Sequence, residues 1–348
     1  MDIKISLQEA YNRASVSLRK KMEHSVDLLQ KAEKLALAYD KEAGYFLAFS
    51  GGKDSQCLYH MAQLAGVKFK AHMNLTSIDP PEVIRFVRKE YPDVDMIKPS
   101  DSIFHIAAER KILPTMRVRW CCAEYKETAG AGKVTLIGIR KSESTRRSMR
   151  NEVEVNSRKF SGTLEELDAF REKRNKRKSS KAITIVNATG ERTLGCIHGK
   201  ESLLISPIIY WTEDDVWEFL NKVVRVPHCE LYDKGFKRIG CILCPMSSPK
   251  QKQIEIAKYP HVKKNWIKAI IKICRRGGYS KVERFLIHCA KKYPQKKLEG
   301  SSSNRLNDEL ENEKAENLFD WWISGKSYKQ WYADKFLQQK INFDDGEE

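Results

Sequence analysis

The six residues Ser50-Gly-Gly-Lys-Asp-Ser55 have the types and spacing of a loop that binds a phosphate group. The glycines Gly51 and Gly52 let an oxyanion approach the backbone, Lys53 supplies positive charge, and the two serines supply hydroxyl donors. The spacing differs from G-x-x-x-x-G-K-S/T, so this is not the common kinase-type phosphate loop. A glycine-rich turn that merely ends a strand is the alternative interpretation.

Four of the nine cysteines form two close pairs. Cys121 and Cys122 are adjacent, and Cys241 and Cys244 have Cys-x-x-Cys spacing. Two such pairs supply the four sulfur ligands of a [4Fe–4S] cluster or of a structural zinc. Adjacent cysteines are unusual at zinc sites, so the first pair favours iron–sulfur. A thioredoxin-like redox pair is the alternative for Cys241 and Cys244, but it leaves the first pair unexplained.

Strand and helix patterns alternate around these residues. Apolar, strand-like runs at Tyr45–Phe49, Phe69–Leu75 and Val134–Ile139 are interleaved with helical periodicity at Gln56–Ala65 and Pro80–Arg88. This alternation predicts an α/β fold with a doubly wound, mostly parallel sheet covered on both faces. A helical C-terminal extension is expected to follow it.

Later segments are assigned in the same way. Strand-like runs recur at Ile183–Val186 and Leu203–Ile209, and Thr212 followed by acidic residues predicts a helix start. Trp211 and Trp217 are expected in the core.

The chain is expected to contain three regions. Residues 1–43 are amphipathic packing helices, and residues 44–250 form a nucleotide-binding domain with an exposed basic insertion at about 160–181. Residues 251–348 form a helical, basic region with a polar linker at about 300–317.

The charge balance points to an anionic partner. Lys and Arg number 63 against 46 Asp and Glu, which gives a formal charge of +17 over 348 residues. A hydrophobic content of 41% is sufficient for a globular core, which argues against wholesale disorder and fibrous repeats. Neither an export signal nor a membrane span is apparent, and the cysteine usage is that of reduced thiols or metal ligands. We therefore expect a cytoplasmic protein with no membrane partner.

The chain resembles the phosphoadenylyl-sulfate (PAPS) and adenylyl-sulfate (APS) reductase family within the PP-loop ATP pyrophosphatases. The first loop matches the SGGxDS motif of that superfamily at every position. Five blocks follow the order of the reductase family: Ser50–Ser55, Cys121–Lys126, Gly138–Arg147, Pro207–Trp217 and Leu231–Pro245. The resemblance implies an adenine nucleotide alpha-hydrolase-like fold, and it implies Cys121, Cys122, Cys241 and Cys244 as ligands of a [4Fe–4S] cluster.

The same resemblance assigns further residues. The nucleotide would be bound by the six loop residues, Asp54 included, and by Arg140, Ser144 and Arg147, because guanidinium groups suit phosphate and sulfate. Lys237 and Arg238 are further candidates for anion contacts. Catalytic roles fall to Lys53, to Arg140 and to Lys126, whose counterpart in the family lies beside the cluster.

Two features depart from the reductases. The family's C-terminal signature with the nucleophilic cysteine is missing, and the last cysteine of this chain is Cys289, beside His288. Basic neighbours of Cys289 would favour a thiolate, so it is the candidate nucleophile. The complete Ser50–Ser55 loop is the second departure, because sulfate reductases need no triphosphate.

Two reactions therefore remain open. The first is reduction of APS or PAPS to sulfite with a thioredoxin-type reductant. The second is ATP-dependent sulfur insertion, with Mg²⁺ and a sulfur donor, into a nucleic-acid acceptor bound by the basic insertion and the C-terminal helices, as in DNA phosphorothioation or tRNA thiolation. A non-catalytic nucleic-acid-binding protein is a third interpretation, supported by composition alone.

Overall fold

The computed structural model describes residues 3–126, 129–156, 161–162, 185–186, 192–193, 202–279 and 303–337. They belong to two compact units. The first consists of Met1–Leu75, Asp79–Lys98 and Glu124–Gly240, and the second of Thr76–Ile78, Pro99–Ala123 and Cys241–Glu348. The Ser50–Ser55 loop therefore lies in the first unit, and both cysteine pairs lie in the second.

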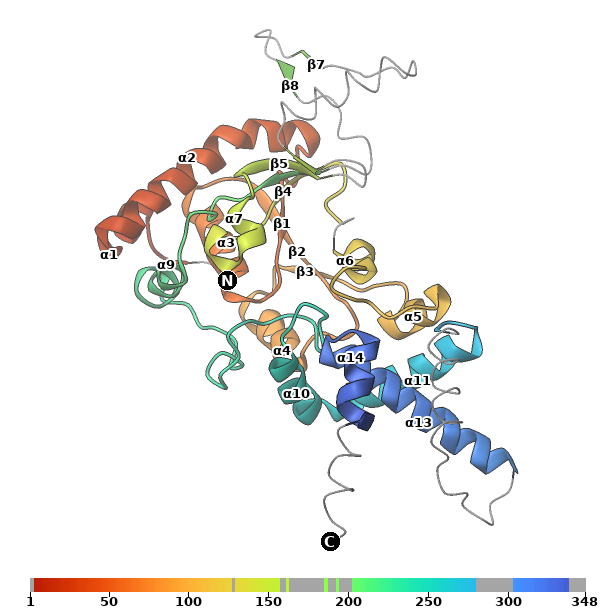
Figure 1. Ribbon diagram of the computed structural model, residues 1–348. Coiled ribbons are helices and arrows are strands. Elements are labelled where there is room, and N and C mark those ends of the chain that lie inside the picture. The colour runs from red at the N-terminus through yellow and green to blue at the C-terminus, as the bar shows by residue number, and fades with distance from the viewer. Residues whose placement is uncertain are drawn as a thin grey trace. The chain divides into compact units, whose positions relative to one another are not determined.

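A seven-stranded sheet forms the centre of the first unit (Figure 1). The first five strands in spatial order are parallel, and the two pairings that add the last two strands are antiparallel. In spatial order the strands are β3 (Asp95–Ile97), β2 (Phe69–Asn74), β1 (Tyr45–Ala48), β4 (Val134–Leu136), β9 (Ser202–Ile205), β5 (Val153–Asn156) and β6 (Ser161–Gly162). A separate antiparallel pair joins β7 (Ile185–Val186) to β8 (Arg192–Thr193). The predicted α/β class with a mostly parallel sheet is confirmed.

The strand order reverses beside β1. From β1 the chain passes through α3 (Lys53–Leu64) to β2 and through α4 (Pro81–Glu90) to β3, and it then returns to place β4 on the other side of β1. Ligands of open parallel sheets bind at such a switch point, beyond the carboxyl ends of the strands. The loops that follow β1 and β4 are therefore the expected ligand-binding loops.

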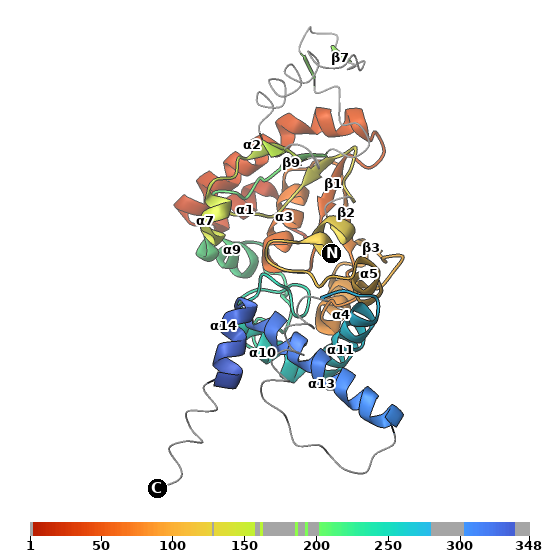
Figure 2. The ribbon, with the colours of Figure 1, turned by 45° about the vertical axis from the view of Figure 1, so that its right-hand side comes forward.

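Helices before and after the sheet hold these loops in place. α1 (Leu7–Arg13) and α2 (Val16–Tyr39) begin at serine caps, and α2 packs against β1, β4 and α3 (Figure 2). On α2, Lys21 binds Asp215 of α9 (Glu213–Glu218) at 2.5 Å. The predicted cap of α9 is confirmed, because the Thr212 hydroxyl accepts the Asp215 N–H. A π-helical turn, Phe219–Val224, follows α9.

Short helical segments precede and follow β4 in the sequence. After β4 come a 3₁₀ turn, Lys141–Glu143, and α7 (Thr145–Ser148). α6 (Trp120–Tyr125) carries the first cysteine pair.

The second unit is helical, as expected for the C-terminal extension. α11 (Pro260–Arg275) packs against α5 (Ile103–Arg110) and α13 (Ser303–Ser324), with Trp266 fully buried at their centre. The remaining elements are α10 (Pro249–Lys258), α14 (Tyr328–Tyr332) and a π-helical turn at Ala333–Leu337. No helix in the described ranges is long and apolar enough to span a membrane.

Two sequence expectations need correction. The linker predicted at about 300–317 is wrong from Ser303 onward, because α13 occupies it and buries Ala315, Leu318 and Phe319 at helical spacing. The strand predicted to reach Ile209 ends at Ile205, because Pro207 has no N–H to donate to a ladder. Most of the basic insertion, including 171–181, lies outside the described residues.

Candidate active site

The Ser50–Ser55 loop joins the end of β1 to the start of α3. Gly52 occupies the N-cap position of α3 and, having no side chain, makes no side-chain hydrogen bond to the first turn of this helix. The Ser55 hydroxyl donates to the Gly52 carbonyl at 2.8 Å and accepts the Ser50 N–H at 3.2 Å. Ser55 therefore closes the loop, and its hydroxyl hydrogen is used within it.

Two glycines allow the loop to pack closely. Gly51 has φ +70°, and a Cβ there would lie 2.8 Å from methyl groups of both Val83 and Val87 on α4. A Cβ on Gly138, after β4, would lie 2.9 Å from the Asp54 carbonyl oxygen. The loops after β1 and β4 thus meet at a distance that only glycine permits.

Tyr232 fixes the start of α3 from another segment. Its hydroxyl accepts the Lys53 N–H at 2.8 Å, and its ring lies 5.2 Å from the Lys53 ammonium group. Burial raises the pKa of Tyr232, so its hydroxyl stays neutral. Trp217 packs edge-on against this ring, with centroids 5.1 Å apart. Trp217 is half-buried and lines a cavity, whereas Trp211 lies in the core as predicted.

Two buried cations and two carboxylates form a network beside the loop. The side chains of Lys53 and Arg140 are each only 3% exposed. Arg140 donates to Asp54 and to Glu213, at 2.6 Å in each case, and to the Ser142 hydroxyl at 3.0 Å. Lys53 lies 3.2 Å from Glu213 and donates to the Lys237 carbonyl at 3.0 Å. Both cations are therefore neutralised within the protein.

The network shifts the pKa of each of three groups. Burial raises the pKa of Asp54, against the opposing effect of Arg140 and Lys53. For Glu213, burial acts to raise the pKa, but Lys53 and Arg140 together outweigh it and lower the pKa. Burial also acts to lower the pKa of Arg140, and the two carboxylates reverse this and raise it. Glu213 and Arg140 are thus charged at neutral pH.

A cavity of about 680 Å³ opens on this network. It brings together five of the residues predicted to bind the nucleotide: Lys53, Asp54, Arg140, Lys237 and Arg238. Ser144 and Arg147 do not line it. The Ser144 hydroxyl caps α7, and Arg147 pairs with Glu143. Arg238 also reaches Glu143, at 3.2 Å.

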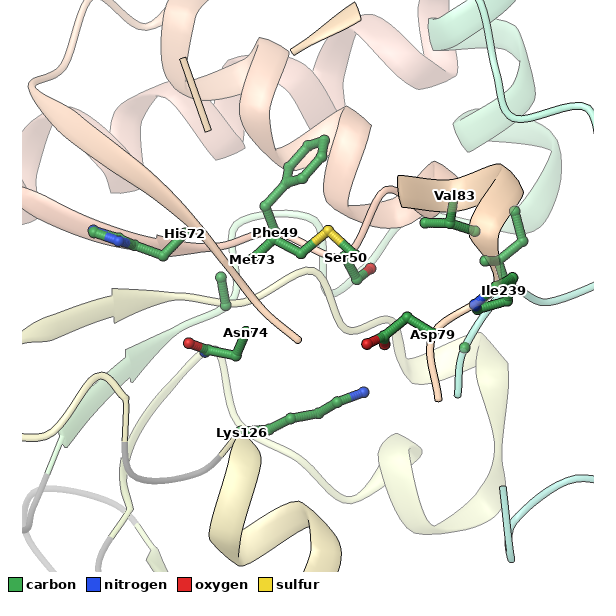
Figure 3. Close-up of a pocket in the computed structure, with 12 residues that line it drawn as sticks. Phe49, Ser50, His72, Met73, Asn74, Asp79, Val83, Lys126 and Ile239 are labelled. Carbon is green, nitrogen blue, oxygen red and sulfur yellow. The ribbon is translucent and has the colours of Figure 1, made fainter. Parts of the chain in front are cut away.

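A second, smaller cavity of about 140 Å³ also borders the loop (Figure 3). Ser50 contributes to its wall, and Lys126 extends from the opposite side toward Asp79 (Figure 3). His72, which stacks on Phe46 with centroids 4.3 Å apart, also lines it. Burial lowers the pKa of His72, which favours a neutral ring.

Several residues that line the two cavities were not among those predicted from the sequence. Tyr232 lies within the recognised Leu231–Pro245 block and could have been found there. Glu213 resembled an ordinary first-turn acid of α9. His72 and Asp79 belong to no motif, and only the sheet order brings them to the loop.

All four cysteines of the proposed quartet belong to the second unit. The hydrogen bond with Cys122, burial, and the charges of Cys122, Cys241 and Cys244 together raise the pKa of Cys121. The thiols thus have the number and type that a [4Fe–4S] cluster needs, and they interact electrostatically. In the described part of the chain, however, no three His, Cys, Asp or Glu residues are placed so as to hold a metal ion. The cluster stays a prediction.

The loop between Cys241 and Cys244 is tied to α10. Leu243 has a left-handed backbone conformation, with φ +57°. Its N–H donates to the Glu255 carboxylate at 2.6 Å. Cys57 and Cys229 are buried, and burial raises the pKa of both thiols, so neither suits a nucleophile. Cys289 lies outside the described residues.

Comparison with known proteins shows what the chain is similar to. The family model described as phosphoadenosine phosphosulfate reductase domain matches residues 44–247. An uncharacterised protein of Methanocaldococcus jannaschii is 26% identical over 270 residues, covering 74% of this chain and 56% of that protein. An adenosine 5'-phosphosulfate reductase of Oceanobacillus iheyensis is 48% identical over 44 residues, which is 13% of this chain and 18% of the reductase.

The chain thus spans about half the length of the first relative and less than a fifth of the second. Among solved structures, a PAPS reductase from Candida auris is similar with a TM-score of 0.37 and 17% identity, covering 66% of this chain and 96% of that one.

Replacing Gly51 with Ala tests the close packing of the loop on α4. We expect the free energy of unfolding to fall by about 2–4 kcal/mol, from the left-handed backbone and the overlap with Val83 and Val87. Gly66→Ala is the matched control, because Gly66 has φ +69° and open space around it, and it should cost about 1 kcal/mol. Urea unfolding measures both variants. Equal losses would show that the loop does not pack on α4 in solution.

Proposed function

The chain belongs to the phosphoadenosine phosphosulfate reductase domain family, and we propose on this basis that its first unit binds an adenine nucleotide at the Ser50–Ser55 loop. The observation that carries the proposal is the pair of buried cations, Lys53 and Arg140, facing a 680 Å³ cavity. Both lie at the switch point of a parallel sheet, beside the N-terminus of α3. This position favours phosphate or sulfate through charge and through backbone N–H groups.

The smaller cavity would take another part of the nucleotide. Phe49, Val83 and Ile239 give it an apolar wall, and Asn74 adds an amide group. A mostly apolar wall with a few polar groups is the usual lining for a flat aromatic ligand. Lys126 would stand at this end of the ligand, in addition to the catalytic role assigned to it by resemblance.

The first candidate reaction is reduction of adenylyl sulfate or its 3′-phosphate to sulfite. A thiolate attacks the sulfur, a sulfur–sulfur bond forms, and the bond from sulfur to the phosphate oxygen breaks, so that the nucleotide leaves with the electron pair. A thioredoxin-type dithiol then releases sulfite and becomes the disulfide, which supplies the two electrons. Cys289 is the candidate nucleophile, while Lys53 and Arg140 would stabilise the leaving phosphate.

The second candidate reaction is ATP-dependent sulfur insertion. In this reaction an acceptor oxygen attacks the α-phosphate of Mg²⁺-bound ATP, pyrophosphate leaves, and sulfur from a donor then displaces AMP. The complete Ser50–Ser55 loop supports this reaction, because reduction of an activated sulfate needs no triphosphate. Among the residues that the structure describes, which do not include Cys289, no cysteine lines either cavity. The exposed lysines Lys264, Lys268 and Lys272 follow one another at four-residue spacing on α11, which suits a nucleic-acid backbone.

Replacing Lys53 with Met tests nucleotide binding. The variant removes one of two buried cations, so ATP, APS and inorganic pyrophosphate should each bind about 10–100-fold more weakly, the loss expected for a charged hydrogen bond. Isothermal titration calorimetry measures the affinities. Lys141→Met is the control, because Lys141 contacts the Tyr210 ring and does not line the cavity. Unchanged affinity in Lys53→Met would show that the Ser50–Ser55 loop does not bind the nucleotide through Lys53.

A product assay separates the two reactions. The full chain is incubated anaerobically with APS, PAPS or Mg²⁺-ATP, with and without a dithiol reductant and nucleic acid, and sulfite, AMP and pyrophosphate are measured. Sulfite that disappears in Cys289→Ser supports the reductase. Pyrophosphate released from ATP and stimulated by nucleic acid supports sulfur insertion and contradicts the reductase.

We further propose that Cys121, Cys122, Cys241 and Cys244 hold a [4Fe–4S] cluster. Bound there, such a cluster would supply redox and electrostatic chemistry to the second unit. Anaerobically purified protein should contain iron and acid-labile sulfide in equal amounts, and Cys121→Ser should lose most of both. Cys274→Ser is the control, because Cys274 is a half-buried cysteine of α11 outside the quartet. Stoichiometric zinc without iron would contradict the cluster.

A further inference from the structure

We propose that Glu213 is an internal counter-anion that occupies the two cations of the nucleotide site and leaves them when an oxyanion binds. The inference rests on the proposed function of the Ser50–Ser55 loop, and it assigns a role to a residue outside the recognised anion-binding positions. One oxygen of Glu213 lies 3.2 Å from the Lys53 ammonium group, and the other accepts from Arg140 at 2.6 Å. The carboxylate thus bridges both cations, as two oxygens of a phosphate or sulfate would.

Glu213 and an incoming oxyanion compete for the same two cations, because the protein already neutralises them. Lys53 and Arg140 carry two positive charges, and Asp54 and Glu213 balance them. An incoming anion adjacent to this neutral network would face two carboxylates at short range, which is unfavourable in a partly buried site. Lys237 and Arg238 also line the cavity, and Arg238 pairs with Glu143, but Lys53 and Arg140 become available to an anion only when a carboxylate withdraws from them.

Glu213 is the carboxylate that can withdraw. Its side chain is 52% exposed, whereas that of Asp54 is 24% exposed and lies within the loop itself. Solvent can hydrate Glu213 once it leaves, so its separation from the cations costs less than that of Asp54. Asp54 can keep its contact with the Arg140 Nε atom and hold the guanidinium in place.

The movement is confined to a side chain. The backbone of α9 is anchored because Asp215 accepts hydrogen bonds from the Thr212 N–H at 2.6 Å and from Lys21 at 2.5 Å. Rotation of Glu213 about its own bonds therefore releases the cations without displacing the helix. Trp217, on the next turn of α9, would keep its place in the wall of the cavity.

The test compares Glu213→Gln with Asp214→Asn by calorimetric titration of inorganic pyrophosphate and of ATP without divalent cations. Glu213→Gln removes the competing charge at nearly constant shape, so both ligands should bind about tenfold more tightly than to the wild type. Asp214→Asn removes the same charge from the same turn of α9, but Asp214 is exposed and does not line the cavity, so the affinity should change less than twofold.

A second variant, Glu213→Asp, and a second measurement, the melting temperature, test the same proposal independently. Glu213→Asp retains the charge but is one methylene too short to bridge both cations, and it should bind with intermediate affinity. Unliganded Glu213→Gln should melt at a lower temperature than the wild type, because two buried cations lose a partner, and pyrophosphate should raise its melting temperature more.

Each outcome decides the inference. Weaker binding by Glu213→Gln would show that Glu213 contacts the ligand or its cation, and equal binding would show that it does not compete; either result overturns the proposal while leaving the nucleotide site intact. Failure of the wild type to bind pyrophosphate, ATP and APS would overturn the nucleotide site and the counter-anion together.

Discussion

The burial of Lys53 and Arg140 is the constraint on which the rest of the first unit depends. A cation that is only 3% exposed needs a partner, because an unpaired buried charge is strongly destabilising. Asp54 on α3, Glu213 on α9 and the Lys237 carbonyl supply these partners. Segments far apart in the sequence must therefore converge for the loop to be stable, and this convergence also creates the 680 Å³ cavity.

The sheet makes that convergence possible. Because β4 lies beside β1, the loop that contains Gly138 and Arg140 runs next to the Ser50–Ser55 loop. Gly138 admits no side chain where it faces the Asp54 carbonyl, and Arg140, two residues further on, donates to the Asp54 carboxylate at 2.6 Å. The anchoring of α9 by Lys21 then fixes where Glu213 enters the network. Fold and site are therefore specified by the same contacts.

The sequence could predict those features that depend only on neighbouring residues. The Ser50–Ser55 loop, the Thr212 cap and the alternation of strands and helices each follow from neighbouring residues, and the α/β class is confirmed. Partners brought from elsewhere could not be predicted: Tyr232 at the start of α3 and Glu213 between the cations are ordinary residues of their own segments. The linker prediction failed because the many charges of α13 masked its buried apolar positions.

An internal counter-anion also bears on which ligands the site would accept. Glu213 satisfies Lys53 and Arg140 with two different oxygens, so a ligand that offers one oxygen would recover only part of what it displaces. A tetrahedral phosphate or sulfate offers several oxygens and can satisfy both cations at once. Specificity is a difference between affinities, and a competing carboxylate enlarges that difference by weakening every ligand that cannot replace it fully. Under the counter-anion proposal, the residue that keeps the unliganded site neutral would also favour oxyanions with two available oxygens over simpler anions.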